Sequence, residues 1–196
     1  VTERFLQYVS FATASDEASP SCPSTEGQRA LGAHLAAELQ ALGLSEVEQD
    51  ADGYVYGYLP GEGPALGLIA HMDTSPAVSG ENIRPAIVPY PGGELALGAS
   101  VLSPCDYPVL EEYVGQQLIV TDGTTLLGAD DKAGVAEIVT LCEELLAHPE
   151  IRHRPIAVCF TPDEEIGRGA DRFRPERFPA AEAYTVDGGE LGEIEY

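Results

Sequence analysis

The sequence predicts an α/β domain in which a largely parallel sheet is flanked by helices on both faces. Three observations indicate this fold class. Short apolar segments alternate with amphipathic ones along the chain. Two of the apolar segments, at 65–70 and 155–160, are continuous, as expected for strands buried on both faces. The length of 196 residues, 44% of them hydrophobic, is enough for one sizeable domain with a real core.

The first predicted helix covers residues 25–42. Four leucines recur on one face of this segment: Leu31, Leu35, Leu39 and Leu42. Thr25 and Gln28 have the spacing of a capping box, and Gly43 stands where a helix would end. We therefore expect a helix that packs against the sheet.

Two strands are predicted next, at 54–59 (YVYGYL, alternating) and at 65–70 (ALGLIA). Residues 74–115 are rich in Pro and Gly, and a third strand candidate, QLIVT, follows at 117–121. A second helix is predicted at 131–148, ending before Pro149. Its apolar side chains have helical spacing: Val135, Ile138, Val139, Cys142 and Leu146. The last strands are predicted at 155–160 and 183–186.

Acidic side chains and one imidazole follow the apolar stretches at 65–70, 126–129, 155–160 and 183–186. In order, they are His71 and Asp73, then Asp130 and Asp131, then Asp163, Glu164 and Glu165, and finally Asp187. Ligands of open α/β sheets bind beyond the carboxyl ends of the strands, so these groups should meet in one crevice. Because so many carboxylates repel one another at low dielectric, either their pKa values rise or a cation binds. A multivalent metal is the expected counter-charge.

The donor types narrow the choice of metal. One imidazole with several carboxylates and no nearby thiolate suits zinc, or manganese or cobalt at a related site, better than calcium. Residues i and i+2 of an extended segment point the same way, so Asp73 can accept a hydrogen bond from the far ring nitrogen of His71. The carboxylates exceed the need of one zinc, which fits a two-metal site with one acid left as general base.

Each motif also has an ordinary structural interpretation. H-x-D alone is more often a surface or core histidine, DEE a solvated loop, and GADDKAG a helix start. The chain has no P-loop, no G-x-S-x-G, and no cysteine placed beside a histidine as a nucleophile would be. The metal interpretation is favoured because all four motifs end apolar stretches and occur in a compatible order.

Composition argues against several classes of partner. The 33 acidic and 10 basic residues give a net charge of −23, which repels nucleic acid and anionic membranes. No apolar run approaches the ~20 residues that cross a bilayer, and the N-terminal residues lack the order of a signal peptide, so we expect a cytoplasmic protein. Four scattered cysteines are expected to be reduced thiols: Cys22, Cys105, Cys142 and Cys159.

Four longer motifs resemble the peptidase T family: HMDTSP, GTTLLGADDKAGVAEI, CFTPDEEIGRGA and AYTVDGGELGE. These tripeptide aminopeptidases belong to the dinuclear zinc exopeptidases, a group that also holds carboxypeptidases and amino-acid deacylases. The resemblance runs from residue 1 to residue 196. It implies a zinc-exopeptidase-like fold, two zinc ions, and release of the N-terminal residue from a small peptide.

The resemblance also implies roles for individual residues. The metal ligands would be His71 and Asp187 on one zinc, Glu165 on the second, and Asp130 bridging the two. Asp73 would orient His71. Glu164 would be the general base that takes a proton from the bridging water and passes it to the leaving amine. Family members often have a cis peptide after the bridging ligand, here before Asp131. Asp163 and Lys132 would be supporting residues, Lys132 as a structural ion-pair partner.

The resemblance covers only part of the family's architecture. Residues 1–196 would be the N-terminal part of the catalytic domain, without the inserted lid, which binds substrate and often dimerises, and without the rest of the catalytic domain. That remainder carries a last histidine ligand, for which His34, His148 and His153 are poor substitutes. Two alternatives stay open: a related metal-dependent dipeptidase or amino-acid deacylase, and an inactive fragment or non-catalytic interaction module.

Overall fold

The computed structural model describes residues 1–98, 100–189 and 192–194. The chain divides into two compact units. Unit 1 comprises Val1–Pro76 and Gly128–Tyr196, and unit 2 comprises Ala77–Leu127. The sequence did not predict this division, because residues 74–115 showed only a Pro- and Gly-rich composition. None of the described helices is long and apolar enough to cross a membrane.

Unit 1 contains a sheet of five described strands, which are, in spatial order, β1 (Ser45–Gln49), β2 (Val55–Leu59), β8 (Ile156–Thr161), β3 (Leu66–His71) and β9 (Glu182–Thr185). β3 runs parallel to both of its neighbours, β8 and β9, whereas β2 runs antiparallel to β1 and β8. The α/β class is confirmed, and the sheet is mixed because β1 and β2 form a hairpin at one edge. The three strands that carry the predicted site form the parallel half.

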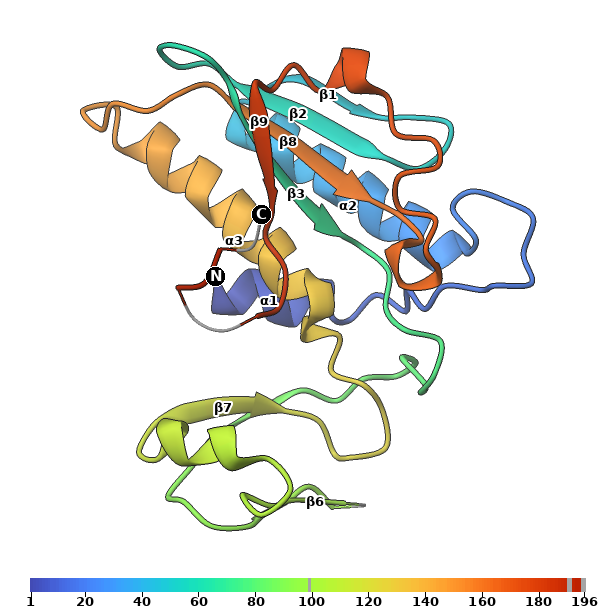
Figure 1. Cartoon of the computed structure of the whole chain (residues 1–196), viewed down its shortest axis with the longest axis vertical. Helices are drawn as coiled ribbons and strands as arrows, with labels where there is room; N and C mark the ends of the chain where they lie inside the picture. The colour runs from blue at the N-terminus through green and yellow to red at the C-terminus, as the bar shows by residue number, and fades with distance from the viewer. Residues whose placement is uncertain (99, 190–191, 195–196) are drawn as a thin grey trace. The chain divides into compact units, whose positions relative to one another are not determined.

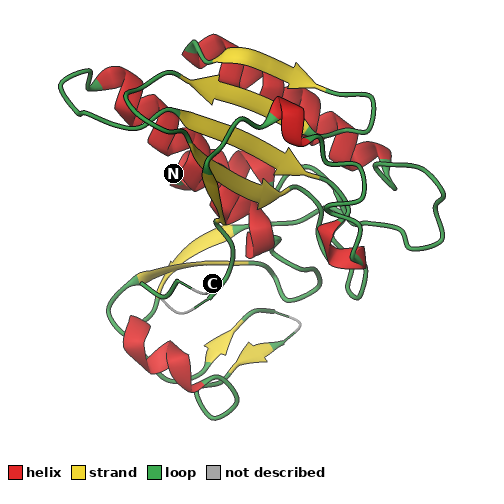
Figure 2. Cartoon of the chain, turned by 45° about the horizontal axis from the view of Figure 1, so that its top comes forward, coloured by secondary structure: helices red, strands yellow, loops and turns green. Residues whose placement is uncertain are grey.

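Three α-helices cover one face of this sheet, namely α1 (Thr2–Tyr8), α2 (Glu26–Leu42) and α3 (Ala129–Ala147). α2 packs on β1 and β2, α3 packs on β3, and α1 and α2 both contact α3 (Figure 1, Figure 2). The opposite face is covered by Phe173 and Phe178, on either side of the short helix η3 (Pro175–Arg177). Phe178 reaches β3 because Gly67 has no side chain, where a Cβ would lie 2.5 Å from its ring. The three described α-helices therefore lie on one face, and a single turn of 3₁₀ helix with its aromatic neighbours covers the other.

α2 begins and ends as predicted but is not capped as predicted. Thr25 is the N-cap residue, and Gly43 closes the helix in the left-handed conformation at φ 100°. The capping-box prediction is wrong. The Thr25 hydroxyl donates to the carbonyl of Ala14, and the Gln28 side chain turns to Asp163 instead. The Gln28 amide still donates to the Thr25 hydroxyl at 3.2 Å, but neither side chain caps a backbone N–H of the first turn.

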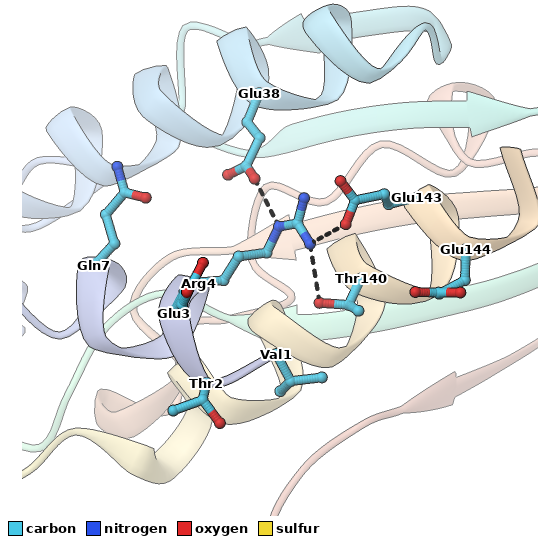
Figure 3. Close-up of a pocket in the computed structure, with 9 residues that line it drawn as sticks. All are labelled: Val1, Thr2, Glu3, Arg4, Gln7, Glu38, Thr140, Glu143 and Glu144. Carbon is cyan, nitrogen blue, oxygen red and sulfur yellow. Dashed lines mark hydrogen bonds and ion pairs between the residues drawn. The ribbon is translucent and has the colours of Figure 1, made fainter. Parts of the chain in front are cut away.

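Arg4 ties α1 to the other two helices (Figure 3). Its Nε donates to Glu38 Oε1 at 2.7 Å, and its Nη1 donates to Glu143 Oε2 at 2.6 Å and Thr140 Oγ1 at 3.2 Å. The Tyr8 hydroxyl also donates to Glu38, at 2.6 Å. We call Arg4, Glu38, Thr140 and Glu143 the Arg4 cluster. The sequence did not predict α1, because seven residues are too short to show a helical period.

Unit 2 is built from two small antiparallel pairs and a 3₁₀ helix. β4 (Ala86–Pro89) pairs with β7 (Gln117–Val120), and β5 (Leu95–Ala96) pairs with β6 (Val101–Leu102). The 3₁₀ helix η1 (Pro108–Tyr113) lies between β6 and β7 in the sequence. The strand predicted at 117–121 exists, but it belongs to this unit and not to the main sheet. The four cysteines are free, as expected.

Candidate metal centre

His71 is the last residue of β3 and its side chain is almost fully buried. Because β8 and β9 run parallel to β3 on either side, their carboxyl ends lie at the same edge of the sheet. The 3₁₀ turn η2 (Glu164–Ile166) follows β8, and Asp187 follows β9. Sheet topology alone therefore brings acidic residues from two segments to one imidazole.

The structure brings together all four predicted metal ligands and the predicted base. The Nε2 atom of His71 lies 2.8 Å from Asp130 Oδ1, and 3.8 Å from both Glu164 Oε2 and Asp187 Oδ2. Two groups of donors can hold a metal ion, His71 with Asp130 and Glu165, and His71 with Asp131 and Asp187. Within each group the ligand atoms lie within 4.8 Å of one another. We call His71, Asp130, Glu164, Glu165 and Asp187 the His71 cluster.

Asp130 reaches the cluster from a helix and not from a strand end. Residues 126–129 form no strand, and Asp130 lies in the first turn of α3 with the non-helical angles φ −82° and ψ 107°. The peptide between Asp130 and Asp131 is cis, as the family resemblance implied. α3 comes close to the end of β9 only because residue 134 is glycine, where a Cβ would lie 1.9 Å from the carbonyl oxygen of Val186.

Asp131 is a support for the cluster more than a free ligand. Its Oδ2 accepts the backbone N–H of His71 at 3.1 Å, and its Oδ1 accepts that of Gly134 at 3.2 Å. Burial and then the charge of Asp187 raise the pKa of Asp131 to about 8. With both oxygens engaged, the buried carboxyl group joins the end of β3 to the start of α3.

Asp73 lies behind His71 and is fully buried. His71 Nδ1 is 3.0 Å from the carbonyl oxygen of Asp73 and 3.4 Å from its carboxylate Oδ1. The same carboxylate accepts the backbone N–H groups of Glu164 at 2.9 Å and Glu165 at 3.1 Å, and the Ser15 hydroxyl at 2.9 Å. Asp73 thus contacts both the imidazole and the turn that carries the two glutamates. The contribution of Ser15 had no sequence signal.

The charges of the cluster fit a divalent cation. Burial lowers the pKa of His71, but hydrogen bonding and charge from Asp73, with further charge from Asp131 and Asp130, outweigh it and raise the pKa to about 10. The pKa of Glu165 is raised by burial and by the charge of Asp130. These carboxylates repel one another, and a metal ion among them would relieve that repulsion. One imidazole with carboxylate oxygens is a donor set that zinc accepts.

The remaining candidate residues lie outside the cluster. Lys132 is buried and donates to the carbonyl of Phe11 at 2.9 Å, so it supports a main-chain segment, and the charge of Asp73 also acts on its ammonium group. His34 packs against Tyr8 and Phe11. His148 lies beside Glu144 and Glu150, and His153 beside the carbonyl of Arg154.

A hollow of about 980 Å³ opens beside the cluster. Asp130 and Asp187 line it together with Glu137 and Tyr184. The Asp130 and Asp187 side chains are 67% and 38% exposed, so both carboxylates can be reached from solvent. The cluster therefore combines a buried imidazole with accessible acids.

Comparison with known proteins identifies relatives of the chain, although no family model matches it. Peptidase T of Aeromonas hydrophila is 56% identical over 199 residues, covering 99% of this chain and 49% of that protein. Among solved structures, aminopeptidase PepT from Bacillus cereus has a TM-score of 0.66 at 25% identity, covering 95% of this chain and 42% of the other. A tripeptidase from Staphylococcus aureus gives a TM-score of 0.66 at 24% identity, with the same coverage.

The chain spans about half the length of the curated relatives it matches. The structural matches show that the fold is that of these two peptidases, over the part of them that the chain covers. The fold and the sequence similarity agree with the motif resemblance. This chain is therefore a peptidase T homologue, similar along its whole length to about half of each of those proteins.

Proposed function

We propose that the protein carrying these residues is a zinc-dependent aminopeptidase that releases the N-terminal residue from tripeptides. The observation that carries the proposal is the convergence of the His71 cluster in a chain 56% identical to a peptidase T. Residues 1–196 would form the N-terminal part of the catalytic domain, with the lid and the rest of that domain outside them. A cytoplasmic location and a homodimeric assembly stay predictions.

The proposed ligand set uses the acids nearest the imidazole. His71 and Asp187 would hold one zinc ion, Asp130 would bridge, and Glu165 would hold the second. Asp73, which contacts the far ring nitrogen, would fix the His71 tautomer that leaves Nε2 free to bind. Bound zinc supplies Lewis-acid polarisation of a substrate carbonyl and a lowered pKa of water.

Glu164 is the proposed general base. Its carboxylate lies at the edge of the cluster, 55% exposed, and so can contact both the attacking water and the substrate. It would accept a proton from that water and then donate it to the leaving amine. The hydrogen bond from its backbone N–H to Asp73 holds the start of the turn, so the main chain that carries the carboxylate is fixed before substrate binds.

The assay that tests the proposal compares substrates in the natural gene product that contains this chain. We expect hydrolysis of Ala-Ala-Ala to exceed that of Ala-Ala and of acetyl-alanine, to stop with a chelator, and to return with Zn²⁺. Cleavage of acetyl-alanine alone would replace the aminopeptidase proposal by a deacylase, and preference for Ala-Ala would favour a dipeptidase. Hydrolysis that survives complete metal removal would contradict a metal mechanism.

One observation favours a second candidate for the 196-residue chain alone. Its other three histidines lie outside the cluster, so the second zinc would lack an imidazole ligand. The isolated chain would then be a folded, metal-binding but inactive polypeptide. Zinc stoichiometry separates the cases: about one tightly held zinc without hydrolysis supports the inactive form, whereas two zincs with turnover contradict it.

A further inference from the structure

The turn that carries Glu164 and Glu165 is held by two buried carboxylates. Asp73 accepts the N–H groups at the start of the turn. Asp163, which precedes Glu164, is fully buried and has the left-handed angles φ 57° and ψ 29°, a conformation uncommon for residues other than glycine. Aspartate adopts this conformation more readily than most residues, and contacts from outside the turn can select it.

Gln28 makes that contact from α2. Its Nε2 donates to Asp163 Oδ1 at 2.7 Å, and its Oε1 accepts the backbone N–H of Asp163 at 3.0 Å. The amide thus closes a ring with one residue, bonding to its side chain and its main chain together. Ser24 completes the arrangement by donating its N–H, at 2.8 Å, and its hydroxyl to the same carboxylate. Gln28 itself has no exposed surface.

The pairing requires one donor and one acceptor at residue 28. A glutamine amide supplies both, whereas an ionised glutamate of the same shape would place a carboxylate oxygen against Asp163 Oδ1. A leucine would leave the Asp163 N–H without its acceptor in a buried site, and Asp163 Oδ1 would keep only the Ser24 hydroxyl as a donor. The contact with Asp163 therefore requires both a donor and an acceptor at residue 28, and a side chain of the right size alone cannot replace them.

We propose that Gln28 is a positioning residue that sets the location of Glu164 and Glu165 by holding Asp163 in the left-handed conformation. This inference rests on the proposed function, because it matters only if these glutamates bind metal or move a proton. Gln28 contacts none of the reacting groups. It acts through Asp163, and its effect should appear as weaker metal binding and slower turnover.

The test is a swap of hydrogen-bond polarity, read out by Zn²⁺ affinity of the 196-residue chain in competition with a chromophoric chelator. Gln28→Glu is expected to weaken zinc binding roughly 10- to 100-fold, the usual range for residues that support metal ligands. Asp163→Asn should also weaken it. The double variant should recover most of the loss, since the carboxylate introduced at position 28 can then accept from both the side-chain amide introduced at position 163 and the backbone N–H there. In the natural gene product, the same variants should lower kcat more than they raise KM.

Gln49→Glu is the matched control. Gln49 is a partly buried glutamine that donates to the carbonyl of Arg29, a residue of α2 like Gln28. The variant therefore makes the same amide-to-carboxylate change away from the His71 cluster. It should leave zinc affinity within about twofold of the parent. If Gln28→Glu fails to fold, Ser24→Ala takes its place. This variant removes a single hydroxyl and should weaken zinc binding in the same direction, but less.

Different outcomes would contradict the positioning role of Gln28 and the proposed zinc-dependent function. The positioning role alone would be overturned if Glu165→Ala weakens zinc binding by the chain but Gln28→Glu does not. If Gln28→Glu fails to fold, unchanged zinc binding by Ser24→Ala would overturn it in the same way. A double variant no better than the weaker single variant, or an equal loss in Gln49→Glu, would overturn it as well. A parent chain that binds no zinc would contradict both proposals.

Discussion

Carboxylates gather at two places in unit 1, and the two clusters are balanced differently. In the Arg4 cluster, Glu38 and Glu143 each accept a hydrogen bond from the same guanidinium. The bond to Arg4 lowers the pKa of Glu143. In the His71 cluster the direction reverses, because burial and the charge of Asp130 raise the pKa of Glu165.

The difference shows which cluster is complete within the chain. Arg4 supplies the counter-charge for its acids and joins three helices, so that cluster needs no ligand (Figure 3). Around His71, four carboxylates meet one imidazole, and the nearby Lys132 is bonded to a carbonyl group. Acidic residues alone therefore do not indicate a metal site. The useful sign is acids that converge on an imidazole, a group that can bind metal, without an arginine or lysine side chain among them.

Removing one carboxylate from each cluster should break the comparison most sharply. Glu164→Gln in the natural gene product is expected to lower kcat for Ala-Ala-Ala by roughly 10²- to 10⁴-fold, the usual contribution of a general base. Zinc content, measured by atomic absorption, should not change. Glu143→Gln makes the same substitution in the Arg4 cluster and should leave kcat within about twofold. Normal turnover by Glu164→Gln would remove Glu164 from the proposed role.

Removing the cation of the Arg4 cluster should have a smaller effect, on stability alone. Arg4→Met leaves Glu38 partly buried with Tyr8 as its remaining hydrogen-bond donor, and we expect the free energy of unfolding to fall by about 1–3 kcal/mol. Urea denaturation of the 196-residue chain measures this change. Zinc affinity should stay the same, because Arg4 lies outside the His71 cluster. A tenfold loss of zinc affinity would mean that the two clusters are not independent.

The sequence was sufficient to predict the location of residues that directly follow a strand of the sheet. Apolar runs predicted β2, β3, β8 and β9, and parallel pairing then places His71, the glutamate turn and Asp187 at one sheet edge. It placed Asp130 after an apolar stretch at 126–129 as if at a strand end, although Asp130 lies in the first turn of α3, because a short apolar run does not distinguish a strand from an irregular segment.

Contacts between distant segments could not be predicted. Gln28 had the spacing of a capping box, and only the fold shows that its amide also bonds to Asp163, 135 residues along the chain. Gly134 carried no signal beyond its presence in a helix start, although its missing side chain lets α3 approach Val186. The roles of Gln28 and Gly134 depend on residues far away in the chain, and the patterns of a single sequence do not show which distant residues meet.

The most direct test of the metal centre is an anomalous difference map, recorded at the zinc absorption edge from crystals of the chain grown with Zn²⁺. We predict a peak about 2.0–2.2 Å from His71 Nε2 and from a carboxylate oxygen of Asp187, with Asp130 and Glu165 around the same ion or a second one. A map with no peak in the His71 cluster, and zinc only at His34, His148 or His153, would contradict the account.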